Sequence, residues 1–204
     1  MSSRVALVAP QVARDGGVAT HVLDSAEALR AAGHEVALIC ARSAYAVEDI
    51  PSVTYVDVED ARSFEETLRA CAADVVHLHD YADPEVVAAA RHVAPAVLSA
   101  HAYPGCSPNT HYFRPGQECD RPHGAGCIAN MALRGCLHAR DPRRVPAKYR
   151  QASRRMAAYE RADGVVGYSR AVVRHLARNG FDPQQVPLFT PMDPADCCPS
   201  VSWA

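Results

Sequence analysis

Short apolar runs alternate with longer amphipathic segments along most of this 204-residue chain. The runs are hydrophobic almost throughout, as strands are when helices cover both faces of a parallel sheet. The segments between them repeat apolar residues at helical spacing, so the alternation predicts an α/β fold with a doubly wound parallel sheet. The expected strands are residues 4–10, 34–41, 53–58, 74–80, 96–101, 164–169 and 186–189, and the expected helices are residues 17–33, 63–72, 84–92, 146–161 and 169–179.

The chain is expected to form one domain over residues 1–191, with an insert at about 104–145 and a tail at 192–204. Its composition, 49% hydrophobic and 22% charged, is that of a globular protein with a substantial core. The net charge is −2 and no long block of one sign occurs. This balance argues against a nucleic-acid partner.

A basic stretch is the exception to this charge balance. A solvated helix face explains it, and so does a patch for an anionic membrane surface or a charged acceptor. No segment resembles a signal peptide and no apolar run is long enough to cross a bilayer, so we expect a cytoplasmic protein with at most peripheral membrane contact. The residues of the stretch are Arg140, Arg143, Arg144, Lys148, Arg150, Arg154 and Arg155.

Two adjacent glycines, Gly16 and Gly17, lie where the first expected strand hands over to the first helix. Because they lack Cβ atoms, they can adopt positive φ and let a ligand approach, while the helix start offers unpaired N–H groups to an anion. A tight turn without a ligand is the alternative. The dinucleotide pattern G-x-G-x-x-G does not occur in this loop, which disfavours a dehydrogenase.

Four stretches together resemble the amino-terminal domain of the family 4 glycosyltransferases of GT-B fold. They are "DGGVATHVLDSAEALRAAGHEV", "ADVVHLHD", "SAH" and "ADGVVGYSRAVVRHLARNGF", and the resemblance runs from Arg4 to about Pro191. It implies a Rossmann-like domain and retaining transfer of a sugar from a nucleotide-diphosphate donor. It also implies that no cofactor is required and that the acceptor, a glycan, a lipid or a small molecule, binds mainly to this domain.

The resemblance further assigns roles to residues at the ligand edge of the sheet. His101 corresponds to the active-site histidine that contacts the donor sugar, and Gly16 and Gly17 would approach the donor diphosphate. At the remaining strand ends we expect an acceptor pocket. For His79, a buried core position is the alternative. For His77, a buried core position is the expectation. The expected pocket residues are His21, His79, Asp80, Tyr103, Ser169 and Arg170.

The chain departs from the family pattern at its end. It stops where the linker to a donor-binding domain would begin, so we expect half of an enzyme, a truncated product or one subunit of a split transferase, with the donor domain supplied in cis or in trans. Glu27 and Glu35 have the spacing of the glutamates that hold the donor in the family, but they lie in the wrong domain. We therefore interpret that match as coincidence.

The insert contains four cysteines, Cys106, Cys119, Cys127 and Cys136, within 31 residues. Two disulfides, a zinc site and four free thiols are the alternatives, and the absence of a C-x-x-C pair in the insert weakens the zinc interpretation. Because the insert follows His101, we expect it to fold over the acceptor mouth.

Three function classes follow from these observations. The chain is the acceptor-side domain of a glycosyltransferase, a non-catalytic binding or partner subunit on the same fold, or a metal-binding module on a Rossmann-like scaffold. Nucleotide-sugar binding separates the first two classes, and metal analysis tests the third.

Overall fold

A seven-stranded parallel sheet forms the centre of the molecule, in the order β3-β2-β1-β4-β5-β8-β9. The structure is a computed structural model that describes residues 2–10, 17–41, 53–56, 60–81, 83–106, 112–114, 117–119, 121–133, 136 and 142–185. The strands are β1 (Arg4–Ala9), β2 (Glu35–Ala41), β3 (Val53–Val56), β4 (Val75–His79), β5 (Ala96–Ala100), β8 (Gly164–Gly167) and β9 (Gln184–Gln185). The expected doubly wound parallel sheet is confirmed.

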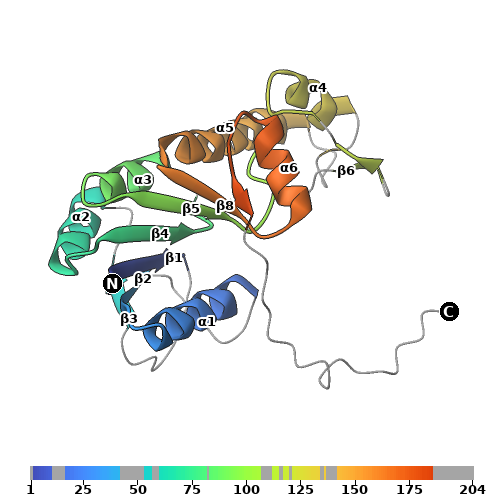
Figure 1. Cartoon of the computed structure of the whole chain (residues 1–204). Helices are drawn as coiled ribbons and strands as arrows, with labels where there is room; N and C mark the ends of the chain where they lie inside the picture. The colour runs from blue at the N-terminus through green and yellow to red at the C-terminus, as the bar shows by residue number, and fades with distance from the viewer. Residues whose placement is uncertain are drawn as a thin grey trace, which may run out of the picture.

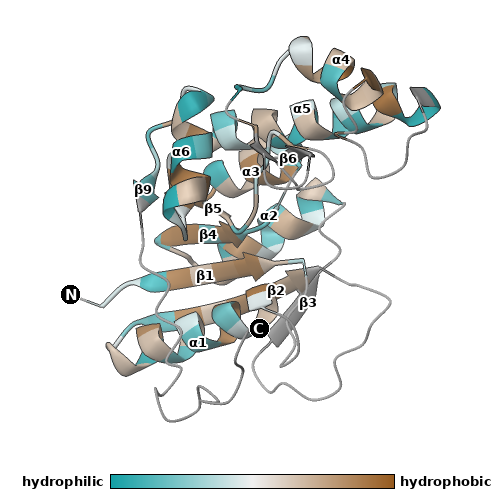
Figure 2. Ribbon diagram, turned by 90° about the vertical axis from the view of Figure 1, so that its right-hand side faces the viewer, coloured by the Kyte–Doolittle hydropathy of each residue, from teal (hydrophilic) through white to brown (hydrophobic). Residues whose placement is uncertain are grey.

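Helices cover both faces of this sheet (Figure 1). One face packs against α1 (Gly17–Ala31), whose Val22 and Ala26 are buried with Leu7 of β1. The other face packs against α2 (Ala61–Ala70), α3 (Pro84–Arg91), α5 (Val145–Arg161) and α6 (Arg170–Arg178). Figure 2 shows the hydrophobic colouring concentrated in the strands and the hydrophilic colouring on the helices, as burial on both faces requires.

Alternation along the strands decides which side chains meet which helices. In β4, Val76 and Leu78 point into the core under α2, α3 and α5. His77 and His79 therefore lie on the opposite face, the one that α1 covers. In β5, Leu98 and Ala100 are in the same core as Val76, so Ser99 shares the α1 face with the two histidines.

The helix ends carry the expected local signals. Asp83 caps α3 by accepting a hydrogen bond from the Glu85 N–H, and Pro84 follows at the first helical position. After α1, Gly33 has φ +89°, a conformation that glycine adopts without steric cost. The last predicted strand, 186–189, lies outside the described residues, and the ladder in this region is formed by Gln184–Gln185.

The insert adds a short antiparallel pair, β6 (Tyr112–Arg114) and β7 (Gln117–Glu118), and the helix α4 (Gly126–Leu133). A 3₁₀ turn at Pro142–Arg144 leads into α5. The expected tail 192–204 lies outside the described residues. Within the described part of the chain, no helix has the length and hydropathy needed to span a membrane.

Candidate active site

The carboxyl edge of the sheet carries the candidate site, at the point where the chain order reverses. β1 lies between β2 and β4, so the connections leaving β1 and β4 run in opposite directions and open a crevice between them. His79 ends β4, and His101 follows β5. The two strand ends and the start of α1 meet here, as the sequence predicted for the ligand edge.

A hydrogen bond of 3.1 Å joins His79 Nδ1 and His101 Nε2. His79 has no exposed surface, whereas His101 is partly exposed. The second nitrogen of His79, Nε2, is buried without a hydrogen-bond partner among the described residues. His79 is therefore placed beneath His101, and it can act on a ligand at this edge only through that ring.

Ser99 holds a second set of groups directly beside the histidine pair. Its hydroxyl lies 2.6 Å from His77 Nε2 and 3.0 Å from Tyr168 Oη. The Tyr159 hydroxyl donates a hydrogen bond of 3.3 Å to the Ser99 carbonyl. Ser99 thus connects β4, β5, α5 and the end of β8 at one buried point.

His21 of α1 closes the site from the helical side. Its ring lies 4.5 Å from that of Tyr168, 5.5 Å from that of His101 and 5.8 Å from that of His79, measured between centroids. Tyr168 in turn lies 4.5 Å from His101. The structure therefore brings two of the predicted pocket residues, His21 and His79, into contact with the predicted catalytic histidine.

Burial keeps these histidines neutral. Loss of water and, to a smaller extent, the neighbouring histidines lower the pKa of His77 and of His101 to about 4. The same causes hold the pKa of His79 well below its usual value of 6.5. Burial also lowers the pKa of His21, which Asp24 opposes. At neutral pH the cluster therefore supplies hydrogen-bond donors and acceptors, not positive charge.

Gly17 is the first residue of α1 and does not have positive φ, so the left-handed backbone that glycine allows is not used at this position. A Cβ atom added to Gly17 would meet no atom of the described residues within 4 Å. The described residues therefore leave space for a ligand beside the helix start, as the expected approach of a ligand to the glycines requires. Gly16 lies outside the described residues.

Asp80 and Tyr103 lie at the same edge but on the α5 side. Together with Tyr81, Arg155 and Tyr159 they line a small cavity of about 10 Å³, enough for about one water molecule. Partial loss of water raises the pKa of the Asp80 carboxyl, and the positive charge of Arg155 opposes this rise. Asp80 is also one of two described non-glycine residues with positive φ.

The last two predicted pocket residues stand at the start of α6. Ser169 Oγ accepts a hydrogen bond of 3.2 Å from the Val172 N–H and so caps the helix. Arg170 is exposed. Capping accounts for Ser169 without a ligand, so the role of both residues in a pocket stays a prediction.

The described parts of the insert pack against α5 and α6. His123 bonds the Gly105 carbonyl through Nδ1 at 3.0 Å and Ser153 Oγ through Nε2 at 2.9 Å. Its backbone N–H donates to Asn179 Oδ1 at 2.7 Å. The prediction that the insert covers the acceptor mouth stays a prediction.

The four insert cysteines are free thiols. Burial and the neighbouring thiols Cys119, Cys136 and Cys127 raise the pKa of Cys106 to about 12. In the described parts of the chain, no three or more His, Cys, Asp or Glu side chains are arranged to hold a metal ion. The zinc alternative for these cysteines stays a prediction.

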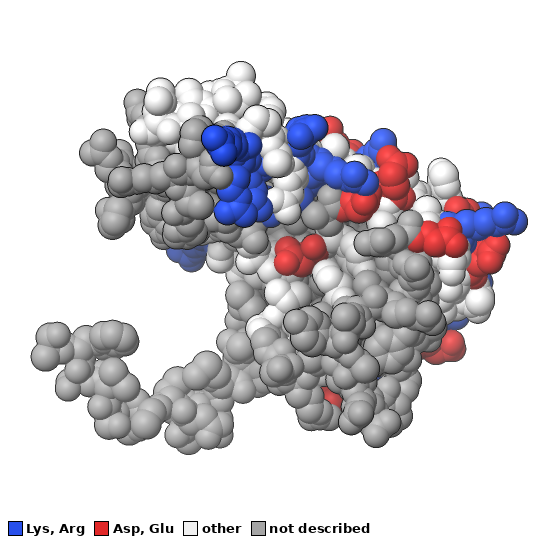
Figure 3. Space-filling view, turned by 180° about the vertical axis from the view of Figure 1, so that it is seen from behind, with Lys and Arg blue, Asp and Glu red and all other residues white. Residues whose placement is uncertain are grey.

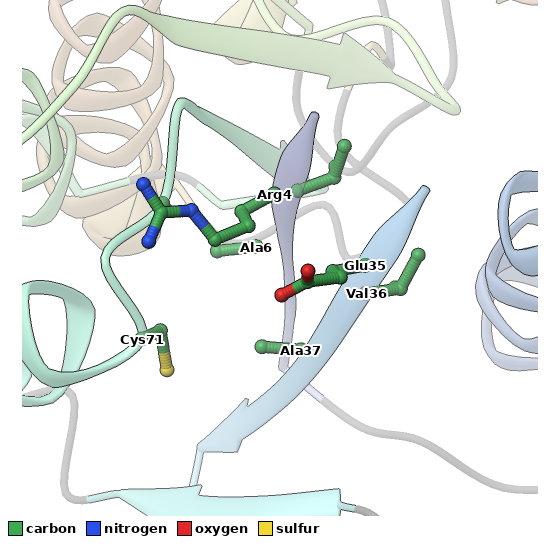
Figure 4. Close-up of a pocket in the computed structure, with 8 residues that line it drawn as sticks. Arg4, Ala6, Glu35, Val36, Ala37 and Cys71 are labelled. Atoms are coloured by element: carbon green, nitrogen blue, oxygen red, sulfur yellow. The ribbon is translucent and has the colours of Figure 1, made fainter. Parts of the chain in front are cut away.

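A second hollow, of about 180 Å³, lies at the amino edge of the sheet (Figure 4). Arg4, Glu35 and Cys71 line it, and Arg4 pairs with Asp74 at 3.5 Å. It is at the opposite end of the strands from the histidines, so it is separate from the candidate site. Glu35, one of the two glutamates whose spacing matches the family pattern by coincidence, is exposed there.

The basic stretch is partly neutralised by acidic neighbours. Arg154 of the stretch pairs with Asp83 at 2.7 Å, and Arg161, which follows the stretch on α5, pairs with Glu85 at 2.8 Å. Figure 3 shows basic and acidic side chains interspersed on the face seen from behind. A solvated helix face accounts for this part of the stretch.

The sequence model of Glycosyltransferase Family 4 matches residues 15–189. The chain belongs to Glycosyltransferase Family 4. The resemblance to the amino-terminal domain of these enzymes is thereby confirmed, and the histidine site lies within the matched residues. No curated protein matches the sequence.

Two solved enzymes resemble this chain weakly, at low identity and with TM-scores below 0.5. One is an alpha-glucosyltransferase in complex with UDP-glucose and DNA containing an abasic site, with a TM-score of 0.43 and 12% identity over 83% of this chain and 36% of that chain. Another is the Bordetella bronchiseptica enzyme WbmH in complex with NAD+, with a TM-score of 0.43 and 16% identity over 82% of this chain and 56% of that chain. The chain thus spans about a third to just over half of the length of these proteins.

Sequence reasoning missed four residues of the candidate site: Ser99, Tyr168, Tyr81 and Arg155. Ser99 and Tyr168 do lie in the strand-end stretches "SAH" and "YSR", and alternation with the apolar residues of β5 could have found Ser99. Arg155 had been grouped with the solvated basic stretch. Its guanidinium instead turns toward the insert and donates a hydrogen bond of 2.6 Å to the Cys106 carbonyl.

Proposed function

We propose that the chain is the acceptor-side half of a retaining glycosyltransferase, which transfers a sugar from a nucleotide-diphosphate donor to a glycan, lipid or small-molecule acceptor. Family 4 membership supports sugar transfer. One observation carries the placement of the site, the meeting of His21, His101 and Tyr168 at the carboxyl edge of the sheet. Ligands of doubly wound sheets bind at this edge.

His101 is the catalytic residue of this proposal. In the transfer step, the bond between the anomeric carbon and the phosphate oxygen breaks, and the acceptor oxygen bonds to the same carbon on the same face. The proton of the acceptor hydroxyl passes to the departing diphosphate. A neutral His101 then acts by hydrogen bonding to the donor sugar as charge develops, and the step as written requires no further cofactor.

The start of α1 supplies the binding site for the diphosphate. Unpaired N–H groups and the positive end of the helix dipole favour an anion there, and the open space beside Gly17 lets it approach. Gly16, which precedes the helix, completes this loop in the proposal. His21 follows one turn later, on the face of α1 that meets His101.

Transfer by this domain is expected to need a donor-binding domain, in cis or in trans, because catalysis depends on holding both substrates in reacting geometry. The purified 204-residue chain should therefore turn over no nucleotide sugar. The test is a radiolabelled-sugar transfer assay with a panel of nucleotide sugars and acceptors, with and without a supplied family 4 donor domain. Turnover by the pure chain would refute the split-site proposal, and no turnover with any donor domain would refute the transferase proposal.

A further inference from the structure

Asp80 has a backbone conformation that its position in the fold does not explain. Its φ is +56°, in the left-handed region that glycine adopts freely and that Asp and Asn tolerate better than most other residues, though at a steric cost. Ala72, with φ +47°, is the other described non-glycine residue in this region. Ala72 lies in the turn after α2, whereas Asp80 directly follows β4 at the candidate site.

The side chain of Asp80 makes no hydrogen bond with the residues that the structure describes, although the residue is exposed overall. Its carboxylate is partly desolvated, and the positive charge of Arg155 acts on it. The backbone N–H donates to the Ser99 carbonyl at 3.3 Å, a bond that glycine would make equally well. Strained residues of this kind persist where their side chains have a function.

The surroundings of Asp80 indicate what its carboxylate can bind. The Arg155 guanidinium is near enough to act on the carboxylate electrostatically, so the pair brings one negative and one positive charge to the edge. The Tyr81 hydroxyl lines the same small cavity and is buried without a hydrogen-bond partner in the described part of the chain. Hydrogen-bond acceptors and hydrogen-bond donors with little net charge are together suited to binding sugar hydroxyls. A phosphoryl group would instead face the Asp80 carboxylate.

We propose that Asp80 binds hydroxyl groups of a neutral, polyhydroxylated acceptor, a sugar or glycoside, and that its left-handed backbone is retained for this task. The carboxylate accepts hydrogen bonds from the acceptor, and Arg155 lines the same cavity. This inference rests on the proposed function, because it makes the α5 side of the edge the acceptor side. It assigns the donor to the α1 side, where the histidines lie.

Three variants of the full chain test the inference. Asp80→Gly relieves the backbone and removes the carboxylate, and Asp80→Asn keeps a residue that tolerates positive φ while removing the charge. Ala72→Gly is the matched control, because it relieves the other strained position away from the site. Thermal unfolding gives Tm, and ¹H–¹⁵N spectra report binding of methyl glucoside, methyl mannoside and maltose, with glucose 6-phosphate and inorganic phosphate as charged probes.

Both glycine variants should raise Tm, by roughly 2 to 4 °C each, because strain is released in both. Asp80→Gly should raise the Kd for a neutral glycoside at least about tenfold, the scale of losing a hydrogen bond to a charged group. Asp80→Asn should weaken it less, and Ala72→Gly should leave it unchanged. A lower Tm in Asp80→Gly, or equal glycoside binding, contradicts the inference.

The set of probes that the wild-type chain binds also decides whether the proposed acceptor class is correct. If the wild-type chain binds phosphate or glucose 6-phosphate but no neutral glycoside, or binds none of the probes, the acceptor class is wrong. Turnover is not measured in this experiment. Glycoside binding that depends on Asp80, combined with no transfer from any donor domain, would therefore leave this inference intact and remove only the proposed function.

Discussion

The rings of His79 and His101 share a hydrogen bond of 3.1 Å, and only His101 reaches the surface. With both rings neutral, one nitrogen of the pair donates and the other accepts. His79 is itself fixed from below, because its ring lies 4.1 Å from that of His77. The orientation of the exposed ring is thus set by a residue that no ligand touches, as supporting groups do in preorganised sites.

Replacing His79 by Ala tests this support. The substitution removes a fully buried ring and leaves His101 Nε2 without its partner, so the free energy of unfolding should fall by about 2 to 4 kcal/mol. Urea denaturation measures the change. His92→Ala is the control, because His92 is exposed, and its effect should stay within about 0.5 kcal/mol. Equal stability of His79→Ala and wild type would mean that the pair of His79 and His101 does not contribute to the free energy of unfolding.

Acid should destabilise the protein through the buried histidines. The folded-state pKa of His77 and of His101 is about 4, against 6.5 for a free histidine, so the unfolded chain binds more protons between these values. Stability is therefore complete above about pH 6.5 and falls as the pH drops toward 4. Urea midpoints between pH 7.5 and 4 measure this slope.

The control for the acid effect is His77→Gln, whose amide can replace the bond to Ser99 without titrating. Its stability should fall less steeply between pH 6.5 and 4 than that of wild type. A wild-type stability that stays constant over this range would contradict the low pKa values.

Ser99 should be more costly to remove than its small size indicates. Ser99→Ala leaves both His77 Nε2 and Tyr168 Oη without a partner and should cost about 1 to 3 kcal/mol. Tyr168→Phe should cost less, since Ser99 keeps His77. The double variant should differ from the sum by more than about 0.5 kcal/mol, because the two residues share one network. Ser2→Ala, which removes an exposed hydroxyl, should change little.

Much of the fold was predictable because it depends on local patterns. Continuous apolar runs predicted the strands, and the alternation of His77 and His79 with Val76 and Leu78 placed both histidines on one face. The meeting of Ser99 and Tyr168 was not predictable in the same way. They lie 69 positions apart and come together because β5 and β8 pair after the insert.

Backbone conformation was the hardest property to infer at the site. The twin glycines permit positive φ, but Gly17 belongs to the helix, while Asp80, at a strand end, has the left-handed backbone. Glycine permits positive φ without requiring it. The role of Arg155 was hidden for a related reason, since its helical segment reads as solvated and only packing against the insert shows which basic residue turns inward.

Gly17 separates the effects of fold and ligand approach. Because a Cβ there meets no described residue within 4 Å and the position is helical, Gly17→Ala should leave stability unchanged or raise it by up to about 1 kcal/mol. In an enzyme completed with a donor domain, Gly17→Val should abolish turnover by blocking the diphosphate. Tm and a transfer assay on both variants measure this. Full turnover by the Val variant would reduce the glycine to a structural role.

His101→Ala tests the reaction itself in the same completed enzyme. If His101 contacts the donor sugar, kcat should fall by about 10² or more, the scale of losing one well-placed polar contact in a dry site. His101→Asn should recover part of the loss, because an amide bonds without titrating. The pH profile of wild type should show no dependence on His101 above about pH 5, since its pKa is about 4. If His101→Ala kept full turnover, or if kcat titrated near pH 6.5 and lost that dependence in His101→Asn, the neutral hydrogen-bonding role would be wrong.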